Sequence, residues 1–312
     1  MTRKIIIDTD PGQDDALAIL LALASQAELE VLGLVAVAGN VPLRLTQSNA
    51  RALVELAGRD DVPVFAGCAR PLLRPLVTAE YVHGKTGIDG SGLPAPSLPL
   101  QKQHGVDWLI DTVMAHPPGS ITLCTLGPLT NVAMALTKHP AIAERIGEIV
   151  AMGGGFFEGG NTTPAAEFNI YVDPHAAHAV FAAGIKMTLM PLDVTHKALT
   201  TRERLARFGA IATPAGRACH GMLGFFDRFD SEKYGQQGAP LHDPTVIAYL
   251  LQPELFTGKH VNVEVETGSP LTVGMTVVDW WGTSKRAPNC TVMNGIDADG
   301  YFDLLIDRIA TL

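Results

Sequence analysis

The chain has 312 residues, of which 47% are hydrophobic, and its formal net charge at pH 7 is -9. This length and hydrophobic fraction allow one large buried core. The acidic balance argues against a nucleic-acid partner, because phosphate backbones require a basic protein face. We expect no secretory signal and no membrane span, because the first strand begins at once and no apolar segment is long enough. The 4 cysteines are scattered without zinc spacing, which fits a reducing, cytoplasmic compartment.

Strand and helix patterns alternate along most of the sequence. The continuous apolar runs are typical of parallel strands that are covered on both faces. This alternation predicts a single α/β domain over residues 1–312, with a mostly parallel central sheet flanked by helices on both faces. In chain order we expect strands at 5–7, 31–38, 62–65, 121–126, 149–152, 187–192, 261–265, 276–278 and 289–293, and helices at 16–23, 44–57, 106–115, 129–137, 175–183, several segments of 201–234, 245–251 and 301–310.

An acidic stretch follows the first strand and carries Asp8, Asp10, Asp14 and Asp15 around a Pro-Gly turn. Carboxylates this close repel one another, and burying them without partners is costly. A hard cation with oxygen ligands would resolve the repulsion. A helix N-terminus also favours acidic residues, but one cap and one first-turn acid would satisfy it. Four acids therefore favour a metal site over a cap alone, and no phosphate-binding glycine motif is present.

Further polar residues follow other expected strands, at the sheet edge where ligands of such folds bind. Asn40 ends the second strand and is either a ligand-binding residue or a turn former. The Pro- and Gly-rich segment 71–99 is long enough to cover a site, and its His83 is either part of that site or an ordinary surface histidine. Segment 160–174 reads as a loop, and its Asn161, Glu167 and Asn169 either bind the vicinal hydroxyls of a sugar or belong to an ordinary polar loop.

His242 and Asp243 open a helix near the last third of the chain. Asp243 could be a plain helix cap. The pair equally places a carboxylate beside an imidazole that can exchange protons near neutral pH.

With these residues in place, the chain resembles the nucleoside hydrolases of the inosine–uridine-preferring type. The matching motifs occur in family order and combine DTDPGQDD with a later AEFNIYVDP; they are found at 8–15, 39–40, 126–131, 152–154, 161–174 and 242–244. The resemblance implies a tightly bound Ca²⁺, held by the carboxylates of Asp10, Asp15 and Asp243 and the backbone carbonyl of Leu126. Asp8 would orient these ligands. The substrate would contact Asp14, Asn40, His83, Met152, Asn161, Glu167, Asn169, Tyr234 and Asp243.

The resemblance also implies the chemistry. A calcium-bound water would lose its proton to Asp14 and attack the ribose, so that the N-glycosidic bond of a ribonucleoside breaks. His242 is the candidate acid for the leaving base. Overall similarity favours the pyrimidine-preferring bacterial branch, with a non-specific inosine–uridine hydrolase as the alternative. A homotetramer and a role in nucleoside salvage are carried over as family expectations.

Two other functions compete with this one. The first strand's Asp8-Thr9-Asp10 resembles the nucleophile motif of haloacid dehalogenase phosphatases, but Asp14, Asp15 and segment 161–169 would then have no role. A calcium-dependent nucleoside-binding protein would need neither Asp14 as a base nor His242 as an acid. Gln13 either touches the substrate or tunes access to it. Trp280 and Trp281 either stack on a base or belong to the core or a subunit interface.

Overall fold

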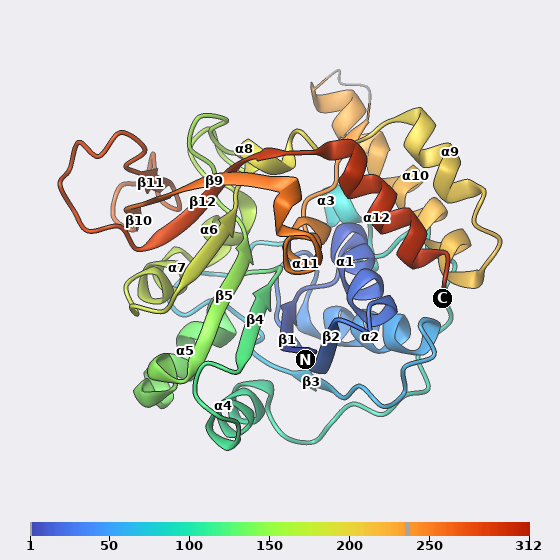
Figure 1. The fold of residues 1–312 in the computed structure, drawn as a ribbon, viewed down its shortest axis with the longest axis horizontal. Coiled ribbons are helices and arrows are strands. Elements are labelled where there is room, and N and C mark those ends of the chain that lie inside the picture. The colour runs from blue at the N-terminus through green and yellow to red at the C-terminus, as the bar shows by residue number, and fades with distance from the viewer. Residues whose placement is uncertain (1, 235–237) are drawn as a thin grey trace.

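The computed structural model describes residues 2–234 and 238–312, and the side chains of residues 227–234 lie outside the description. An eight-stranded sheet crosses the molecule (Figure 1). Its strands pair in parallel except at one edge, where β9 runs antiparallel to β12. The strands lie in the order β3 (Val64–Ala66), β2 (Leu29–Ala36), β1 (Arg3–Thr9), β4 (Ile121–Thr125), β5 (Ile146–Met152), β6 (Met187–Met190), β12 (Cys290–Ile296) and β9 (Phe256–Val261).

The sheet has a topological switch point between β1 and β4. From β1 the chain adds β2 and β3 on one side, and it then returns to add β4, β5 and β6 on the other. In open α/β sheets a crevice forms at such a point, outside the carboxyl ends of the strands. The residues that follow β1 and β4 therefore have the position expected of a ligand-binding site.

Helices cover both faces of the sheet because its central strands are apolar on both sides. Ile5 and Ile7 of β1 belong to one core cluster and Ile6 belongs to the other, as the alternation of side chains along a strand requires. Figure 1 shows the two layers of helices on either side of the strands. The first core is shared by α1 (Gln13–Ala24), α2 (Leu43–Leu56), α10 (Pro214–Tyr234), α11 (Pro244–Leu251) and α12 (Ala298–Ile309), and the second by α4 (Gly105–Ala115), α5 (Thr130–Lys138) and α7 (Pro174–Phe181).

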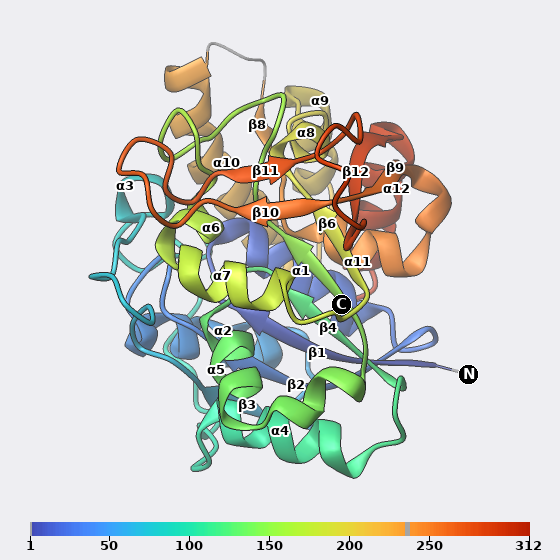
Figure 2. The ribbon, with the colours of Figure 1, turned by 90° about the vertical axis from the view of Figure 1, so that its left-hand side faces the viewer.

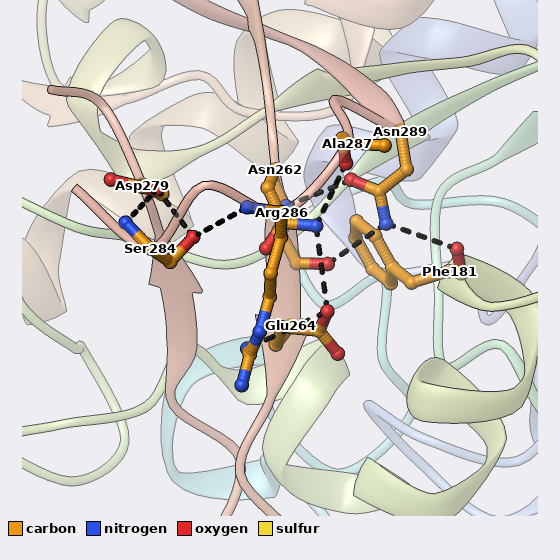
Figure 3. Close-up of polar contacts among 9 residues, drawn as sticks. Phe181, Asn262, Glu264, Asp279, Ser284, Arg286, Ala287 and Asn289 are labelled. Carbon is orange, nitrogen blue, oxygen red and sulfur yellow. Dashed lines mark hydrogen bonds and ion pairs between the residues drawn. The ribbon is translucent and has the colours of Figure 1, made fainter. Parts of the chain in front are cut away.

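A small hairpin lies outside the main sheet, beside α7 (Figure 2). It pairs β10 (Val263–Val265) with β11 (Thr276–Val278) in antiparallel register. The chain that returns from it is tied down by polar contacts, which Figure 3 shows: Asn289 Nδ2 donates to the Phe181 carbonyl over 3.2 Å, and Arg286 pairs with Glu264 at 3.6 Å. The remaining elements are β7 (Leu199–Thr200), β8 (Ala239–Pro240), α3 (Glu80–His83), α6 (Phe168–Val172), α8 (Leu192–Thr195), α9 (Arg202–Gly209) and two 3-10 turns, Pro140–Glu144 and Pro253–Leu255.

The expected architecture is confirmed, but the sequence pattern misses some local elements, among them strand β9 and helix α6. The sequence pattern does not predict strand β9, because its four central residues are exposed and include a glycine and a lysine, so it lacks an apolar pattern. The expected loop at 160–174 contains helix α6, whose five residues are too few for a visible helical period. Among the described residues, no helix has the length and apolar character needed to cross a bilayer.

Candidate active site

A pocket whose empty volume is about 670 Å³, with the open solvent at its mouth included, lies beyond the carboxyl ends of the strands. Predicted residues from the sheet edge line its inner part: Asp14, Asn40, Leu126, Met152 and Asp243. The others come from segments laid over that edge: His83, Asn161, Glu167, Asn169 and His242. Asp10 and Asp15 are fully buried beneath the pocket, and the side chain of Tyr234 lies outside the described residues.

We call Asp10, Asp14, Asp15 and Asp243 the acidic floor. Carboxylate oxygens of Asp14, Asp15 and Asp243 lie within 4.8 Å of one another. Asp15 is held in place by the Thr9 hydroxyl at 2.5 Å and by the Gly12 backbone N–H at 3.0 Å. The Gly12 contact is a capping interaction at the start of α1, so the helix-cap interpretation is correct for Asp15. Capping therefore explains Asp15 but not the other three residues of the acidic floor.

Asp10 is the member of the floor with the clearest need for a cation. Its Oδ2 accepts the Asn40 backbone N–H at 2.7 Å, whereas its buried Oδ1 has no hydrogen-bond partner among the described residues. A Cβ at Gly39 or Gly127 would lie 2.0 or 2.1 Å from its oxygens, so glycine at both positions lets the backbone close around the carboxylate. Burial and the negative charge of Asp15 raise the pKa of Asp10 well above its usual value.

The donor set of the floor fits a hard divalent cation. Burial, together with the charges of Asp14 and Asp15, also raises the pKa of Asp243 well above its usual value. A cation would reverse both shifts by favouring the ionised form. Leu126 presents a backbone carbonyl that accepts one hydrogen bond, from Asn169 Nδ2 at 2.7 Å, and retains a second lone pair. Carboxylate and carbonyl oxygens without sulfur or imidazole are the ligands of calcium or magnesium.

Asp8 lies behind the floor rather than in it. Its Oδ2 accepts the Asn131 side-chain amide at 2.8 Å, and burial raises its pKa to about 7. This position is consistent with the predicted orienting role.

The predicted sugar-binding residues are brought together around the start of α6. Glu167 caps this helix and accepts the backbone N–H groups of Asn169 and Gly154, each at 2.9 Å. Burial raises the pKa of Glu167 to about 7. Asn161 accepts the Phe168 backbone N–H at 3.0 Å, and Asn169 also donates to the carbonyl of Met152 at 3.3 Å. The amides and the carboxylate are therefore fixed at one side of the pocket, next to the floor.

Three histidines also line the pocket, and we call His83, His196 and His242 the histidine side. His242 Nδ1 lies 2.7 Å from the Thr195 hydroxyl. Burial, with a smaller contribution from the other two histidines, lowers the pKa of His242 to about 3. Burial likewise lowers the pKa of His83 to about 3, and its ring stacks on Phe226 with centroids 5.6 Å apart. Both imidazoles are therefore neutral at pH 7 in the free protein.

Sequence reasoning missed His196, whose Nδ1 lies 3.2 Å from Glu158 Oε2. A signal was present, because His196 follows β6 at the same sheet edge as the other site residues. Phe226 has no such signal, since it lies within the long helix α10. Trp280 does not line the pocket but stacks on Phe156, and Trp281 is 76% exposed, so the core or interface interpretation fits them better than base stacking.

Comparison with known proteins agrees with this geometry. The family model described as inosine-uridine preferring nucleoside hydrolase matches residues 5–303. A pyrimidine-specific ribonucleoside hydrolase RihA of Citrobacter koseri is 46% identical over 311 residues, which is 99% of each chain. An uncharacterized protein of Schizosaccharomyces pombe is 50% identical over 309 residues, again 99% of each chain.

Solved structures agree as well. A plant nucleoside hydrolase superposes with a TM-score of 0.93 at 33% identity over 100% of both chains. A purine-preferring ribonucleoside hydrolase of Gardnerella vaginalis gives a TM-score of 0.92 at 31% identity, over 99% of this chain and 98% of that one. The fold and the site thus define an enzyme that hydrolyses the N-glycosidic bond of ribonucleosides. The chain belongs to the inosine–uridine-preferring nucleoside hydrolase family.

Proposed function

We propose that this nucleoside hydrolase is calcium-dependent and prefers the pyrimidine ribonucleosides uridine and cytidine. The observation that carries the proposal is the acidic floor, which lies directly beside the fixed carboxylate and amides of Glu167 and Asn169. The pyrimidine preference is supported by the relatives at 46% identity, which are named pyrimidine-specific. A non-specific inosine–uridine hydrolase is the second candidate, because a structure of equal fold at 31% identity is named purine-preferring.

Asp10, Asp15 and Asp243 would hold the calcium ion with their carboxylates, and Leu126 would add its carbonyl. When bound, the ion would supply positive charge that acidifies a neighbouring water and orients the ribose hydroxyls. The same hydroxyls would be held by Asn40, Asn161, Glu167 and Asn169. Most of these groups are already fixed by hydrogen bonds within the protein, so little ordering would be needed on binding.

Asp14 would take a proton from the attacking water, because its carboxylate belongs to the floor and lines the pocket. As the N-glycosidic bond lengthens, positive charge develops on the ribose, and the carboxylates of Asp14 and Glu167 would stabilise it. The departing base takes the bonding electrons and must be protonated or solvated. Thr195 occupies Nδ1 of His242, so Nε2 is the nitrogen that would serve the leaving base.

The proposal also covers the assembly and the location of the enzyme. Trp281 and Phe157 are 76% and 64% exposed, which supports burial of this surface between subunits of a homotetramer. The four cysteines are free, which is consistent with a reducing cytoplasm.

The first test is the rate of ribose release by calcium-loaded protein from uridine, cytidine, inosine, adenosine and guanosine. We expect a large preference for uridine and cytidine. Equal rates on inosine and uridine would favour the non-specific enzyme. Failure to release ribose from any of them would leave a nucleoside-binding protein as the better proposal.

The second test replaces the proposed base. Asp14→Ala should lower kcat by about 10²- to 10⁴-fold, the usual contribution of a general base, with bound calcium and circular dichroism close to those of the wild type. Asp60→Ala makes the same change at an exposed position and should leave kcat unchanged. Survival of activity in Asp14→Ala would overturn the assignment of the base.

A further inference from the structure

Gln13 and His83 are joined by a pair of hydrogen bonds at the histidine side of the pocket. Gln13 is the first residue of α1, and it is fully buried. Its Nε2 donates to the carbonyl of His83 at 2.9 Å and to the carbonyl of Asp89 at 3.2 Å. Its Oε1 lies 2.7 Å from His83 Nδ1. One amide group therefore contacts both the backbone and the ring of the same histidine.

These contacts fix the orientation of the Gln13 amide. A backbone carbonyl oxygen can only accept a hydrogen bond, so the side of the amide that faces two carbonyls must be the NH₂ group. With the amide reversed, its oxygen would face two other oxygens, and repulsion would replace both hydrogen bonds to the backbone. The oxygen of Gln13 is therefore the atom that faces the ring.

The orientation of the amide in turn determines the tautomer of His83. An amide oxygen cannot donate, so the hydrogen between it and Nδ1 belongs to the ring. Burial lowers the pKa of His83 to about 3, so the ring carries one proton at pH 7 rather than two. With that proton on Nδ1, Nε2 is a bare acceptor. The described residues supply no hydrogen bond to Nε2, and His83 lines the pocket.

We propose that Gln13 fixes His83 as the Nδ1–H tautomer, so that His83 Nε2 accepts a hydrogen bond from an N–H group on the edge of the nucleobase. The second half of the proposal rests on the proposed function. Substrates of the favoured class carry such a group, for example the ring N3–H of uracil or the exocyclic amine of cytosine. His83 is then a specificity-determining residue that cannot protonate the leaving base, and Gln13 is its positioning residue.

The surroundings of the ring support a fixed geometry. One face of His83 stacks on Phe226. A Cβ at Gly12 would lie 2.5 Å from Nδ1 and 2.7 Å from Cε1, so a side chain larger than hydrogen at Gly12 would push the ring away from Gln13. The ring is thus confined from three directions, by Gly12, Gln13 and Phe226.

The chain offers a matched control for Gln13. Asn49 holds the same covering segment through its side-chain amide, which donates to the carbonyl of Thr86 at 2.7 Å and of Pro11 at 3.0 Å. Both of these hydrogen bonds go to the backbone rather than to the ring of His83. Gln13→Met and Asn49→Leu each replace an amide by an apolar group of similar size. Both changes remove hydrogen bonds that hold the covering segment, but only Gln13→Met removes the contact that fixes the tautomer of His83.

The direct test is ¹⁵N NMR of the imidazole nitrogens in the substrate-free wild-type protein, with His83→Phe used to assign the signal. We expect a protonated Nδ1 and a bare Nε2 for His83. Gln13→Met should move both shifts toward an exchanging mixture of tautomers, and Asn49→Leu should leave them in place. A protonated Nε2 of His83 in the wild type would overturn the proposal, and this result does not depend on an activity assay.

The kinetic test compares kcat/KM for uridine with that for 3-methyluridine, in which the N3–H is absent. The wild type should favour uridine, and the ratio should fall in Gln13→Met by up to about tenfold, the factor that complete loss of one buried hydrogen bond costs, because only part of the His83 population would keep the accepting tautomer. Asn49→Leu should lower both values and leave the ratio unchanged. An unchanged ratio in Gln13→Met would overturn the role in base recognition. No ribose from uridine in the wild type would overturn the proposed function, while the NMR result would still decide the tautomer.

Discussion

The acidic floor and the histidine side lie in the same pocket but are built in different ways. The floor comes from the residues that directly follow β1, together with Asp243 at the start of α11. The histidine side comes from α3, from the residue after α8 and from the loop before α11. The acidic floor is fixed by strands inside the sheet. The histidine side is fixed by side-chain contacts between segments far apart in sequence, such as the contact of Gln13 with His83.

Burial favours the neutral form in both regions, but it shifts the pKa values in opposite directions because one region holds acids and the other holds bases. Burial raises the pKa of the carboxyls of Asp10 and Asp243 and lowers the pKa of His83 and His242. Each shift favours the neutral form. A cation would restore the charge of the floor, whereas the histidine side would suit an uncharged base. Under the proposed function, one pocket would hold an ionic subsite for the sugar and a neutral one for the base.

The largest effect is expected from breaking the floor. Asp10→Asn should abolish calcium binding and lower kcat/KM by more than about 100-fold, the upper loss typical of residues that only orient a metal ligand. In the wild type, calcium at about 100 times its Kd should add about 2.7 kcal/mol to the free energy of unfolding. Calorimetry with calcium and with a chelator measures calcium binding and the free energy of unfolding, and steady-state kinetics measures kcat/KM.

Asp8→Asn is the matched control for Asp10→Asn. Like Asp10, Asp8 is buried, with one oxygen that accepts a hydrogen bond (from Asn131) and one that has no partner among the described residues, but it lies outside the set of proposed ligands. We expect this variant to lose about 10- to 100-fold in calcium affinity, as is typical of residues that orient a metal ligand, and therefore less than Asp10→Asn. Equal losses in the two variants would mean that general burial of carboxylates, and not ligation by Asp10, explains the effect.

The contrast between the two regions explains what the sequence could predict. Asp10, Asp14 and Asp15 lie within six residues of one strand–turn–helix, so local pattern alone places them together at the sheet edge. The alternation of strands and helices likewise predicts the sheet. Strand β9 has no such pattern, because an edge strand with four exposed residues needs no apolar periodicity.

The histidine side could not be assembled from local pattern. His83 and Gln13 are 70 residues apart, and Phe226 reaches the pocket only through the packing of α10. The sequence alone allows Gln13 two roles, contact with the substrate or control of access. In the structure it holds the covering segment at two carbonyls and the His83 ring, which is a contact that only tertiary packing creates.

A smaller effect is expected at His242 when its orienting hydroxyl is removed. Thr195→Val deletes the 2.7 Å contact with Nδ1 and should lower kcat about tenfold with little change in KM, because a ring that can rotate serves the leaving base less often. Thr245→Val is the matched control, since the Thr245 hydroxyl donates to the backbone carbonyl of His242 and not to its ring. Equal losses of kcat in Thr195→Val and Thr245→Val would mean that a shift of the backbone at His242, and not the orientation of its ring, explains the effect.

The smallest effect is expected at His196. Its partner Glu158 is 46% exposed, and polar contacts that solvent can reach contribute little. Glu158→Gln should therefore change kcat/KM for uridine by only about two- to threefold, with Glu254→Gln at an exposed position as the control. The measurement is kcat/KM for uridine in the wild type, in Glu158→Gln and in the control. A loss larger than that of Thr195→Val would reverse the order, and it would make His196 rather than His242 the histidine whose orientation limits departure of the base.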